Sequence, residues 1–165
     1  MELKEIILRL VLSSIFGGII GLERELKNKS AGFVTMILVC LGATTIALIQ
    51  EELLLRQLII AESHPEISNA VNLDLARLSA QVITGVGFIG GGAIIYNKDK
   101  IQGITTAAVL WVTAAIGLAV GYGFIFLSIS TFTIVFITLI IMKSIEQRII
   151  FKFKKKIMEK ISEKE

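Results

Sequence analysis

Residues 101–142 read IQGITTAAVLWVTAAIGLAVGYGFIFLSISTFTIVFITLIIM, a stretch of 42 residues without one charged side chain. One membrane crossing needs only about 20 apolar residues, because a helix rises about 1.5 Å per residue and the hydrocarbon core is about 30 Å thick. The stretch is therefore long enough for two crossings, and Gly121-Tyr122-Gly123 supplies a turn between them. A soluble chain of 165 residues could not bury such a run beside further apolar segments. The sequence thus indicates an integral membrane protein and excludes soluble enzymes, nucleic-acid binders and secreted disulfide-linked folds.

Further apolar segments precede this stretch, so we predict an all-α integral membrane protein with a bundle of about five transmembrane helices. The crossings are expected over residues 6–22, 32–49, 76–96, 104–120 and 124–142. The first is expected to be a retained helix and not a signal peptide, because no small-residue cleavage site follows it. The chain then divides into a transmembrane domain over residues 1–142 and a cytoplasmic tail over residues 143–165.

The positive charges are distributed unevenly across these crossings. Five crossings place 13 lysines and arginines on the side of the C-terminus and four on the other side. The positive-inside rule therefore predicts the N-terminus outside and the C-terminus in the cytoplasm.

The tail has apolar residues at four-residue spacing between lysines, which predicts a C-terminal basic amphipathic helix. The apolar positions are Ile145, Ile149, Phe153, Ile157 and Ile161. Such a helix suits the surface of the anionic inner leaflet. A frayed stop-transfer flank, and a docking helix for a partner or a second subunit, stay open as alternatives.

The long connection over residues 50–76 contains a second apolar segment, Leu53–Ile60. This segment is too short to span the membrane, so we expect it to form a separate helix at the outer interface that ends at His64-Pro65. The single histidine and the single cysteine, Cys40, form no metal-ligand grouping. We therefore expect Cys40 to be a small buried side chain.

Small residues recur four positions apart in three of the crossings, at Gly17 and Gly21, Gly87 and Gly91, and Gly117 and Gly121. In lipid, such pairs let helix backbones approach each other closely. They predict a compact bundle or a homo-oligomer.

The third crossing holds a cluster of glycines: Gly85, Gly87, Gly90, Gly91 and Gly92. The cluster formally matches the dinucleotide-binding pattern GxGxxG, but no strand precedes it, so nucleotide binding is rejected. Glycine weakens a helix interior by about 1 kcal/mol relative to alanine. We therefore expect either a broken helix, whose freed carbonyls could bind ions, or close packing against another backbone.

Polar residues at the ends of the crossings are the candidate functional residues. The cytoplasmic group is Glu23, Arg24, Glu25, Thr105 and Thr106. The outer group is Asp74, Arg77 and Gln81. The outer three share one helix face, and Asp74 is the expected partner of Arg77.

The middle of each crossing is free of charged residues and of histidine. A proton relay or an acidic cation site normally needs such a residue. The sequence also has no grouping of residues suited to nucleophilic or acid–base hydrolysis. It therefore predicts a protein that is not an enzyme and has no cofactor, with Mg²⁺ binding left open.

Three blocks of sequence, taken in order, resemble the MgtC/SapB family of membrane proteins. They are Gly21–Glu25 with Ala31–Thr35, Asp74–Gly92, and Gly103–Gly117. Together they cover roughly residues 10–123.

The resemblance implies a multi-pass protein of the bacterial inner membrane. Relatives are linked to growth at low magnesium and to survival inside phagocytes, that is, to stress adaptation and virulence. They are often labelled magnesium transporters, whereas the best-studied members act as regulators, including of ATP synthase. Those members carry a soluble ACT-like domain after the membrane domain, and here only the basic tail follows it.

The leading hypothesis is therefore a membrane protein of low-magnesium adaptation that binds or regulates a membrane partner, such as ATP synthase by family resemblance. The alternative is a transporter or channel for Mg²⁺ or another ion, with a path along the glycines of the third crossing. A structural membrane protein without a ligand is the third reading.

Overall fold

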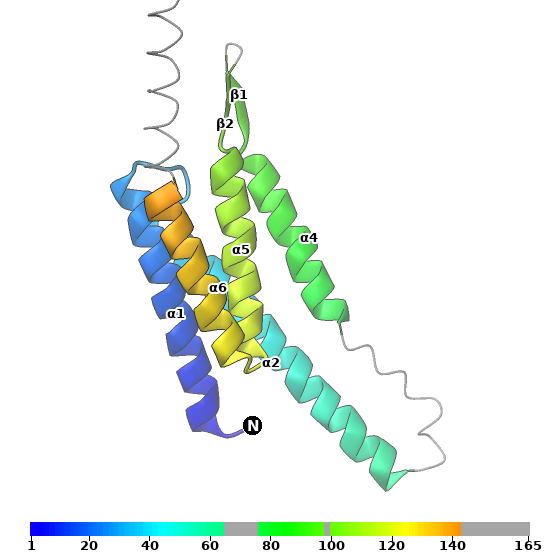
Figure 1. The fold of residues 1–165 in the computed structure, drawn as a ribbon. Helices are drawn as coiled ribbons and strands as arrows, with labels where there is room; N and C mark the ends of the chain where they lie inside the picture. Colours follow the sequence, from blue (N-terminus) through cyan, green and yellow to red (C-terminus); the bar gives the residue numbers. More distant parts are fainter. Residues whose placement is uncertain (65–75, 98–99, 143–165) are drawn as a thin grey trace, which may run out of the picture. The chain divides into compact units, whose positions relative to one another are not determined.

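A computed structural model describes residues 1–64, 76–97 and 100–142 of the chain (Figure 1). Its elements are α1 (Leu3–Leu26), α2 (Phe33–Ser63), α4 (Arg77–Gly92), β1 (Ile95–Asn97), β2 (Lys100–Gln102), α5 (Ile104–Gly121), α6 (Ile125–Ile137) and the π-helical turn η1 (Thr138–Met142). The chain forms two compact units, residues 1–129 and residues 130–165. The predicted tail helix and Asp74 lie outside the described residues.

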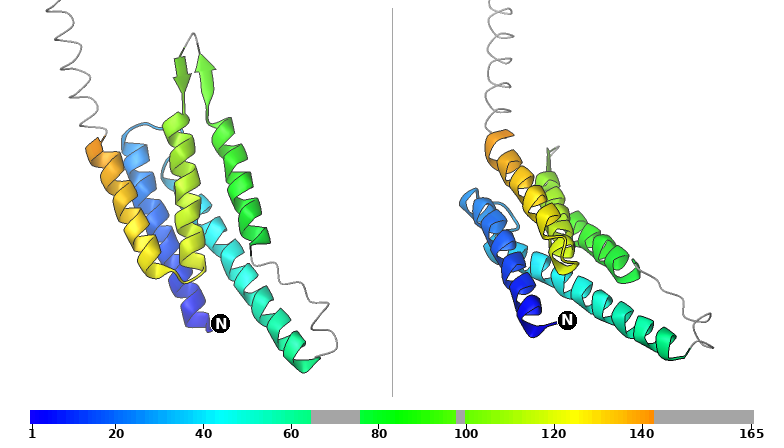
Figure 2. Two further views of the ribbon diagram at one scale, coloured as in Figure 1. Left: turned by 45° about the vertical axis from the view of Figure 1, so that its right-hand side comes forward. Right: turned by 60° about the horizontal axis from the view of Figure 1, so that its bottom comes forward.

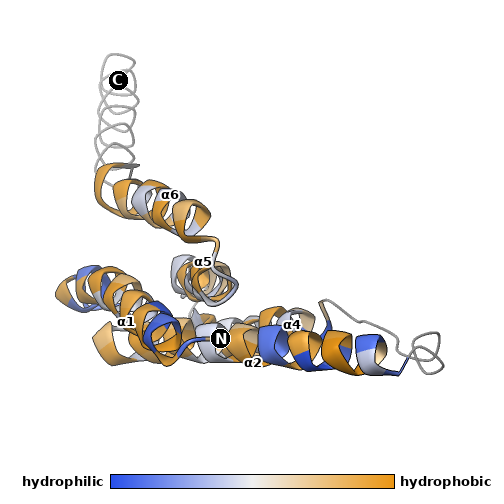
Figure 3. Cartoon of the chain, turned by 90° about the horizontal axis from the view of Figure 1, so that it is seen from below, coloured by the Kyte–Doolittle hydropathy of each residue, from blue (hydrophilic) through white to orange (hydrophobic). Residues whose placement is uncertain are grey.

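The predicted all-α membrane class is confirmed in its broad form. In the part of the chain that the structure describes, α1, α2 and α5 are long and apolar enough to cross a membrane, and a shorter apolar helix begins at Ile125. Figure 3 shows hydrophobic residues along most of each helix, with hydrophilic ones toward the C-terminal part of α2. The number of crossings stays a prediction.

The separate interface helix expected over Leu53–Ile60 is not formed. These residues continue α2, which runs without interruption for 31 residues from Phe33 to Ser63. Strong helix formers occupy the predicted boundary, and Arg56 Nε lies 3.1 Å from Glu52 Oε1 one turn earlier, an ion pair that favours the helix. The helix therefore extends well beyond the length that one crossing needs.

The third predicted crossing also ends earlier than expected. The helix α4 stops at Gly92, and Ile95–Asn97 pairs with Lys100–Gln102 in an antiparallel hairpin instead of extending the helix to residue 96. β-branched Ile95 and Ile101 suit strands. Gly103, with φ of +93°, then turns the chain into α5. Glycine suits this position because other residues rarely adopt this φ and because a side chain there would collide with the Ala93 carbonyl.

The helix α2 is central in residues 1–129 and packs against α1, α4 and α5 (Figure 2). A Cβ atom at Gly17 would lie 2.6 Å from the Met36 carbonyl oxygen, and one at Gly121 would lie 2.7 Å from that of Thr44. Of the three predicted close approaches, those through Gly17/Gly21 and Gly117/Gly121 are therefore confirmed, and these pairs bring α1 and α5 onto α2. The described residues make no close approach at Gly87 and Gly91.

A hydrogen bond also joins α2 and α5 where they meet at Gly117. The Thr44 hydroxyl donates to the Gly117 carbonyl of α5 at 2.8 Å, in addition to a bond within its own helix to Cys40. Cys40 is buried, as expected, beside Gly17 and Gly117. The small residues of α1, α2 and α5 thus bring the three helix backbones into contact. This contact sets the relative positions of the helix ends, where the charged residues lie.

Candidate functional site

The buried charged side chains of the described residues all belong to α1. Arg9 lies near its beginning, and Glu23 and Arg24 lie near its end. Charged groups are costly at membrane depth unless they are paired. Their partners therefore show what each end of the bundle does.

Arg24 joins the end of α1 to the start of α5. Its side chain is only 1% exposed, and Nη2 donates to the Thr106 hydroxyl at 3.2 Å. Glu23 Oε2 lies 3.7 Å from Arg24 Nη1, and Glu23 Oε1 lies 2.6 Å from Lys27 Nζ. The structure thus brings together Glu23, Arg24 and Thr106 of the predicted cytoplasmic group, and it adds Lys27.

The bonding of this cluster is uneven. Arg24 Nε is buried and has no hydrogen-bond partner among the described residues. Glu23 is held by ion pairs with the two basic side chains, Arg24 and Lys27. Buried charge in such a cluster depends strongly on its counter-charge. Thr105, the neighbour of Thr106, is exposed.

Glu25 has a different role from its neighbours. Its Oε2 accepts a hydrogen bond of 3.1 Å from the backbone N–H of Phe33, the first residue of α2. A helix start leaves such N–H groups without partners inside the helix. The carboxylate therefore caps α2 across the connecting loop, and Gly32 leaves room for it, since a Cβ there would collide with Glu25.

Replacing Glu25 with Ala is expected to lower the free energy of unfolding by about 1 kcal/mol, the usual effect of losing a helix cap. Chemical unfolding of the purified protein in detergent, followed by circular dichroism, measures this change. The exposed Ser30→Ala variant is the control from the same loop. An unchanged E25A protein would show that the Phe33 N–H is satisfied in another way.

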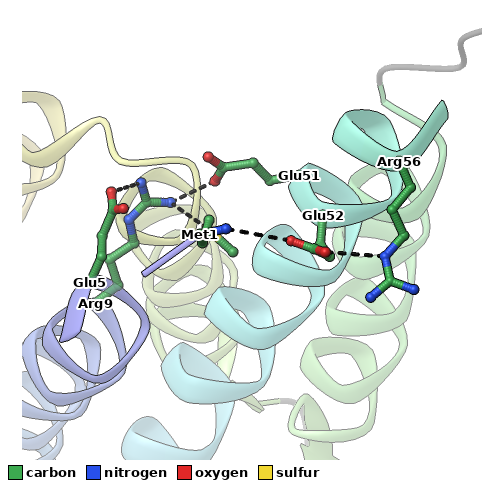
Figure 4. A network of polar contacts seen from close by, with 6 residues as sticks. All are labelled: Met1, Glu5, Arg9, Glu51, Glu52 and Arg56. Atoms are coloured by element: carbon green, nitrogen blue, oxygen red, sulfur yellow. Dashed lines mark hydrogen bonds and ion pairs between the residues drawn. The ribbon is translucent and has the colours of Figure 1, made fainter. Parts of the chain in front are cut away.

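Arg9 connects three helices at the opposite end (Figure 4). Its Nη1 donates to Glu51 Oε2 of α2 at 2.6 Å and to the Gly121 carbonyl at the end of α5 at 2.7 Å. Its Nη2 pairs with Glu5 on α1. Sequence reasoning counted Arg9 only as a charge for orientation, although its position inside an apolar segment was a signal that it needed partners.

Replacing Arg9 with Met is expected to lower the free energy of unfolding by about 2 to 3 kcal/mol. The substitution removes a charge-assisted hydrogen bond and leaves the Gly121 carbonyl without its partner. The melting temperature in detergent is the measurement. The R9K variant should lie between R9M and the unchanged protein, since one ammonium cannot reproduce the branched contacts of a guanidinium.

The predicted outer group is not assembled by the described residues. Arg77 and Gln81 are exposed at the start of α4, and the expected pairing of Arg77 with Asp74 lies outside the described residues. The polar contact at this end is made by Ser79, whose N–H donates to Gln50 Oε1 at 3.1 Å and whose hydroxyl lies 2.6 Å from the Tyr122 hydroxyl. Sequence reasoning missed this link between α2, α4 and the turn after α5.

The glycine cluster of α4 does not break the helix, which stays regular up to Gly92. A Cβ atom at Gly90 would lie 3.4 Å from the Ala107 Cβ of α5, an ordinary contact distance. A Cβ atom at any of the other four would meet no described atom within 4 Å: Gly85, Gly87, Gly91 and Gly92. Gly90 therefore faces α5, whereas the neighbouring glycines have room for a side chain. Phe88, 86% exposed, lies among them.

The contacts of these charged residues hold the helices together at both ends of α1. Among the described residues there is no group of three or more side chains suited to hold a metal ion. The charged residues form two clusters of ion pairs, one at each end of α1. Between these clusters, glycines bring the helix backbones into close contact.

Comparison with known proteins matches this chain to a family of membrane proteins. The model of the MgtC family matches residues 10–148. The "Putative magnesium transporter YhiD" of Escherichia coli K12 is 41% identical over 119 residues, covering 72% of this chain and 52% of that protein. "Protein SapB" of Bacillus subtilis is 40% identical over 121 residues, covering 73% and 49% of the two chains.

A third relative carries the family's own name. "Protein MgtC" of Brucella abortus is 34% identical over 111 residues, which are 67% of this chain and 40% of that protein. The chain spans about half the length of the curated relatives it matches. No solved structure matches it.

Proposed function

Since this chain belongs to the MgtC family, we propose that it is a multi-pass protein of the bacterial inner membrane that serves adaptation to low magnesium by binding and regulating another membrane protein. The proposal includes five crossings over residues 1–142, an outside N-terminus, and a basic tail over residues 143–165 on the inner leaflet. It includes no enzymatic activity.

The observation that carries this proposal is the separation of charge from the interior of the bundle. Arg9 and Arg24, with their carboxylate partners, lie at opposite ends of α1. Between them, Ser13 and Thr44 direct their hydroxyls to nearby carbonyls, and glycines bring the backbones into contact. A bundle closed in this way favours protein binding over ion conduction, because conduction needs a continuous polar path.

The helix α4 supports a partner-binding role. Only Val86 and Gly90 are buried along it, so much of its surface is left open by the described residues. Glycine lets a partner helix approach its backbone closely, and in lipid this close contact is what drives helices together. We therefore assign Gly87 and Gly91 to the partner-binding face.

Transport of Mg²⁺ is the competing function, and the printed name of the Escherichia coli relative favours it. Discontinuous helices expose the carbonyls that bind ions in many transporters. The helix α4 is continuous through its glycines and frees no such carbonyls before Gly92. The geometry thus gives transport less support than partner binding.

Two experiments separate the proposals. Purified protein in proteoliposomes is expected to give no Mg²⁺ flux above empty liposomes, beside a known magnesium channel as positive control. Flux that is lost when Gly90 and Gly91 are replaced by bulkier residues would establish transport instead.

Affinity purification from native membranes is expected to recover a stoichiometric membrane partner that is lost with the Gly87→Leu/Gly91→Leu variant. The Ala108→Leu variant, at an exposed position of α5, should retain it. Retention of the partner by the α4 variant would place the binding face elsewhere, and recovery of no partner would contradict the regulatory role.

A further inference from the structure

A groove of about 600 Å³ runs between α1 and α2 toward the N-terminal end of α1. Its walls are apolar along most of their length and include Leu10, Leu48, Ile49 and Leu53. At one end it meets three charged groups: the Met1 amine, Glu52 and Arg56. The groove therefore has a long apolar part and one charged end.

The groove follows α2 across the predicted end of its crossing. Thr45 lines its deep part and Arg56 its charged end, and these residues are separated along α2 by about 16 Å at a rise of about 1.5 Å per residue. The residues nearer Thr45, namely Leu48 and Ile49, belong to the predicted crossing, whereas Glu52 and Arg56 lie just beyond it. The apolar walls can thus contact the first part of an acyl chain whose headgroup lies at the charged end.

The charged end presents an acidic and a basic group side by side. Arg56 Nε donates to Glu52 Oε1 at 3.1 Å, and the Met1 amine lies 3.7 Å from Glu52 Oε2 (Figure 4). Arg56 is 69% exposed, and its terminal nitrogens point away from Glu52 without a hydrogen bond to any described residue. A carboxylate has about four lone-pair sites, so Glu52 retains acceptor capacity.

We propose that this groove binds one phospholipid whose headgroup carries both a phosphate and a primary amine. The acyl chain lies along the wall formed by Leu10, Leu48 and Ile49. The phosphate accepts hydrogen bonds from the Arg56 terminal nitrogens, and the lipid amine donates to Glu52.

The charge pattern selects this headgroup over other common ones. The network at this end holds three positive groups (the Met1 amine, Arg9 and Arg56) and three carboxylates (Glu5, Glu51 and Glu52), so it has no net charge to attract an anionic headgroup. A choline headgroup has the positive charge but no N–H to donate to the carboxylate. A zwitterionic headgroup with a primary amine satisfies both side chains at once.

Native mass spectrometry of the full chain, released from detergent with added lipid, tests the proposal. The probes are phosphatidylethanolamine, phosphatidylcholine and phosphatidylglycerol with identical acyl chains. We expect at least fivefold greater retention of phosphatidylethanolamine than of the other two. Equal retention of the three lipids, or a preference for phosphatidylglycerol, would overturn the proposal.

Variants locate the site. E52Q should reduce the preference for phosphatidylethanolamine over phosphatidylcholine to less than twofold, and R56Q should lower retention of both lipids about fivefold. Lys4→Gln, which removes a positive charge from an exposed residue at the same end outside the groove, should change neither quantity. Unchanged selectivity in E52Q, or equal losses in K4Q and R56Q, would overturn the assignment.

A groove-filling variant tests the acyl part separately. Thr45→Phe occupies the deep part of the groove and should lower retention of all three lipids about fivefold without changing their order. The exposed Thr84→Phe on α4 is the matched control, and circular dichroism confirms that each variant is folded. Full retention by T45F would show that the acyl chain does not lie in this groove.

Discussion

Replacing Glu23 with Gln is expected to lower the free energy of unfolding by about 3 to 5 kcal/mol, the range found when one member of a buried ion pair is removed. Arg24 would then remain 1% exposed without the carboxylate that lies 3.7 Å from it. Its hydrogen bond to Thr106 is to a neutral hydroxyl and does not neutralise the charge. Chemical unfolding in detergent, followed by circular dichroism, measures the loss.

The reciprocal substitution should cost less. In R24M, Glu23 keeps its ion pair with Lys27 at 2.6 Å, so the carboxylate is not left alone. The double variant E23Q/R24M should recover most of the stability lost in E23Q, because it removes both charges. Glu62→Gln, at an exposed position of α2, is the control. Simple additivity of the two single effects would show that Glu23 and Arg24 are not coupled.

Replacing Gly117 with Leu is expected to lower the free energy of unfolding by about 3 kcal/mol, at the upper end of the usual effect of overpacking. A Cβ atom there would collide with the Cys40 carbonyl and lie 3.0 Å from the Ala43 Cβ. A backbone carbonyl inside a helix cannot rotate away as a side chain can, so α5 would have to move off α2. The same movement would break the hydrogen bond from Thr44 to Gly117.

The matched control is the same substitution in α4. A Cβ atom at Gly91 would meet no described atom within 4 Å, so the effect of Gly91→Leu should stay within about 0.5 kcal/mol. The melting temperatures of the two variants in one detergent give the comparison. Equal losses of stability in G117L and G91L would show that the close contact between α2 and α5 does not cause the effect of G117L.

Local pattern was sufficient to predict the apolar helical class and one part of the candidate site, but not the ends of α2 and α4. Hydropathy located the apolar helices, and four-residue spacing located the glycines that bring α1 and α5 onto α2. The grouping of Arg24 with Thr106 followed from placing both at the cytoplasmic ends of their crossings. That inference needed only the direction of each helix, not its rotation.

Features that depend on helix rotation or on distant partners were not predictable. Arg9 binds a carbonyl 112 residues away, and nothing in the sequence near Arg9 identifies Gly121 as that partner. The link from Ser79 to Gln50 and Tyr122 likewise depends on which faces of three helices meet. The hairpin over Ile95–Gln102 was missed because its strands of three residues give too short a pattern to compete with the apolar helix before them.

Arg9 and Arg24 each bind a group far along the sequence, and this separation has a consequence for biosynthesis. The ribosome completes α1 well before α5, since Thr106 follows Arg24 by 82 residues and Gly121 follows Arg9 by 112 residues. The α1–α2 hairpin can form early, because Glu25, Phe33 and the Gly17 contact with α2 are all present by then. Nascent chains that have not yet produced α5 therefore hold two arginines whose bonding is incomplete. Arrival of α5 supplies the Thr106 hydroxyl to Arg24 and the Gly121 carbonyl to Arg9, so docking of that helix adds a hydrogen-bond partner at both ends of α1.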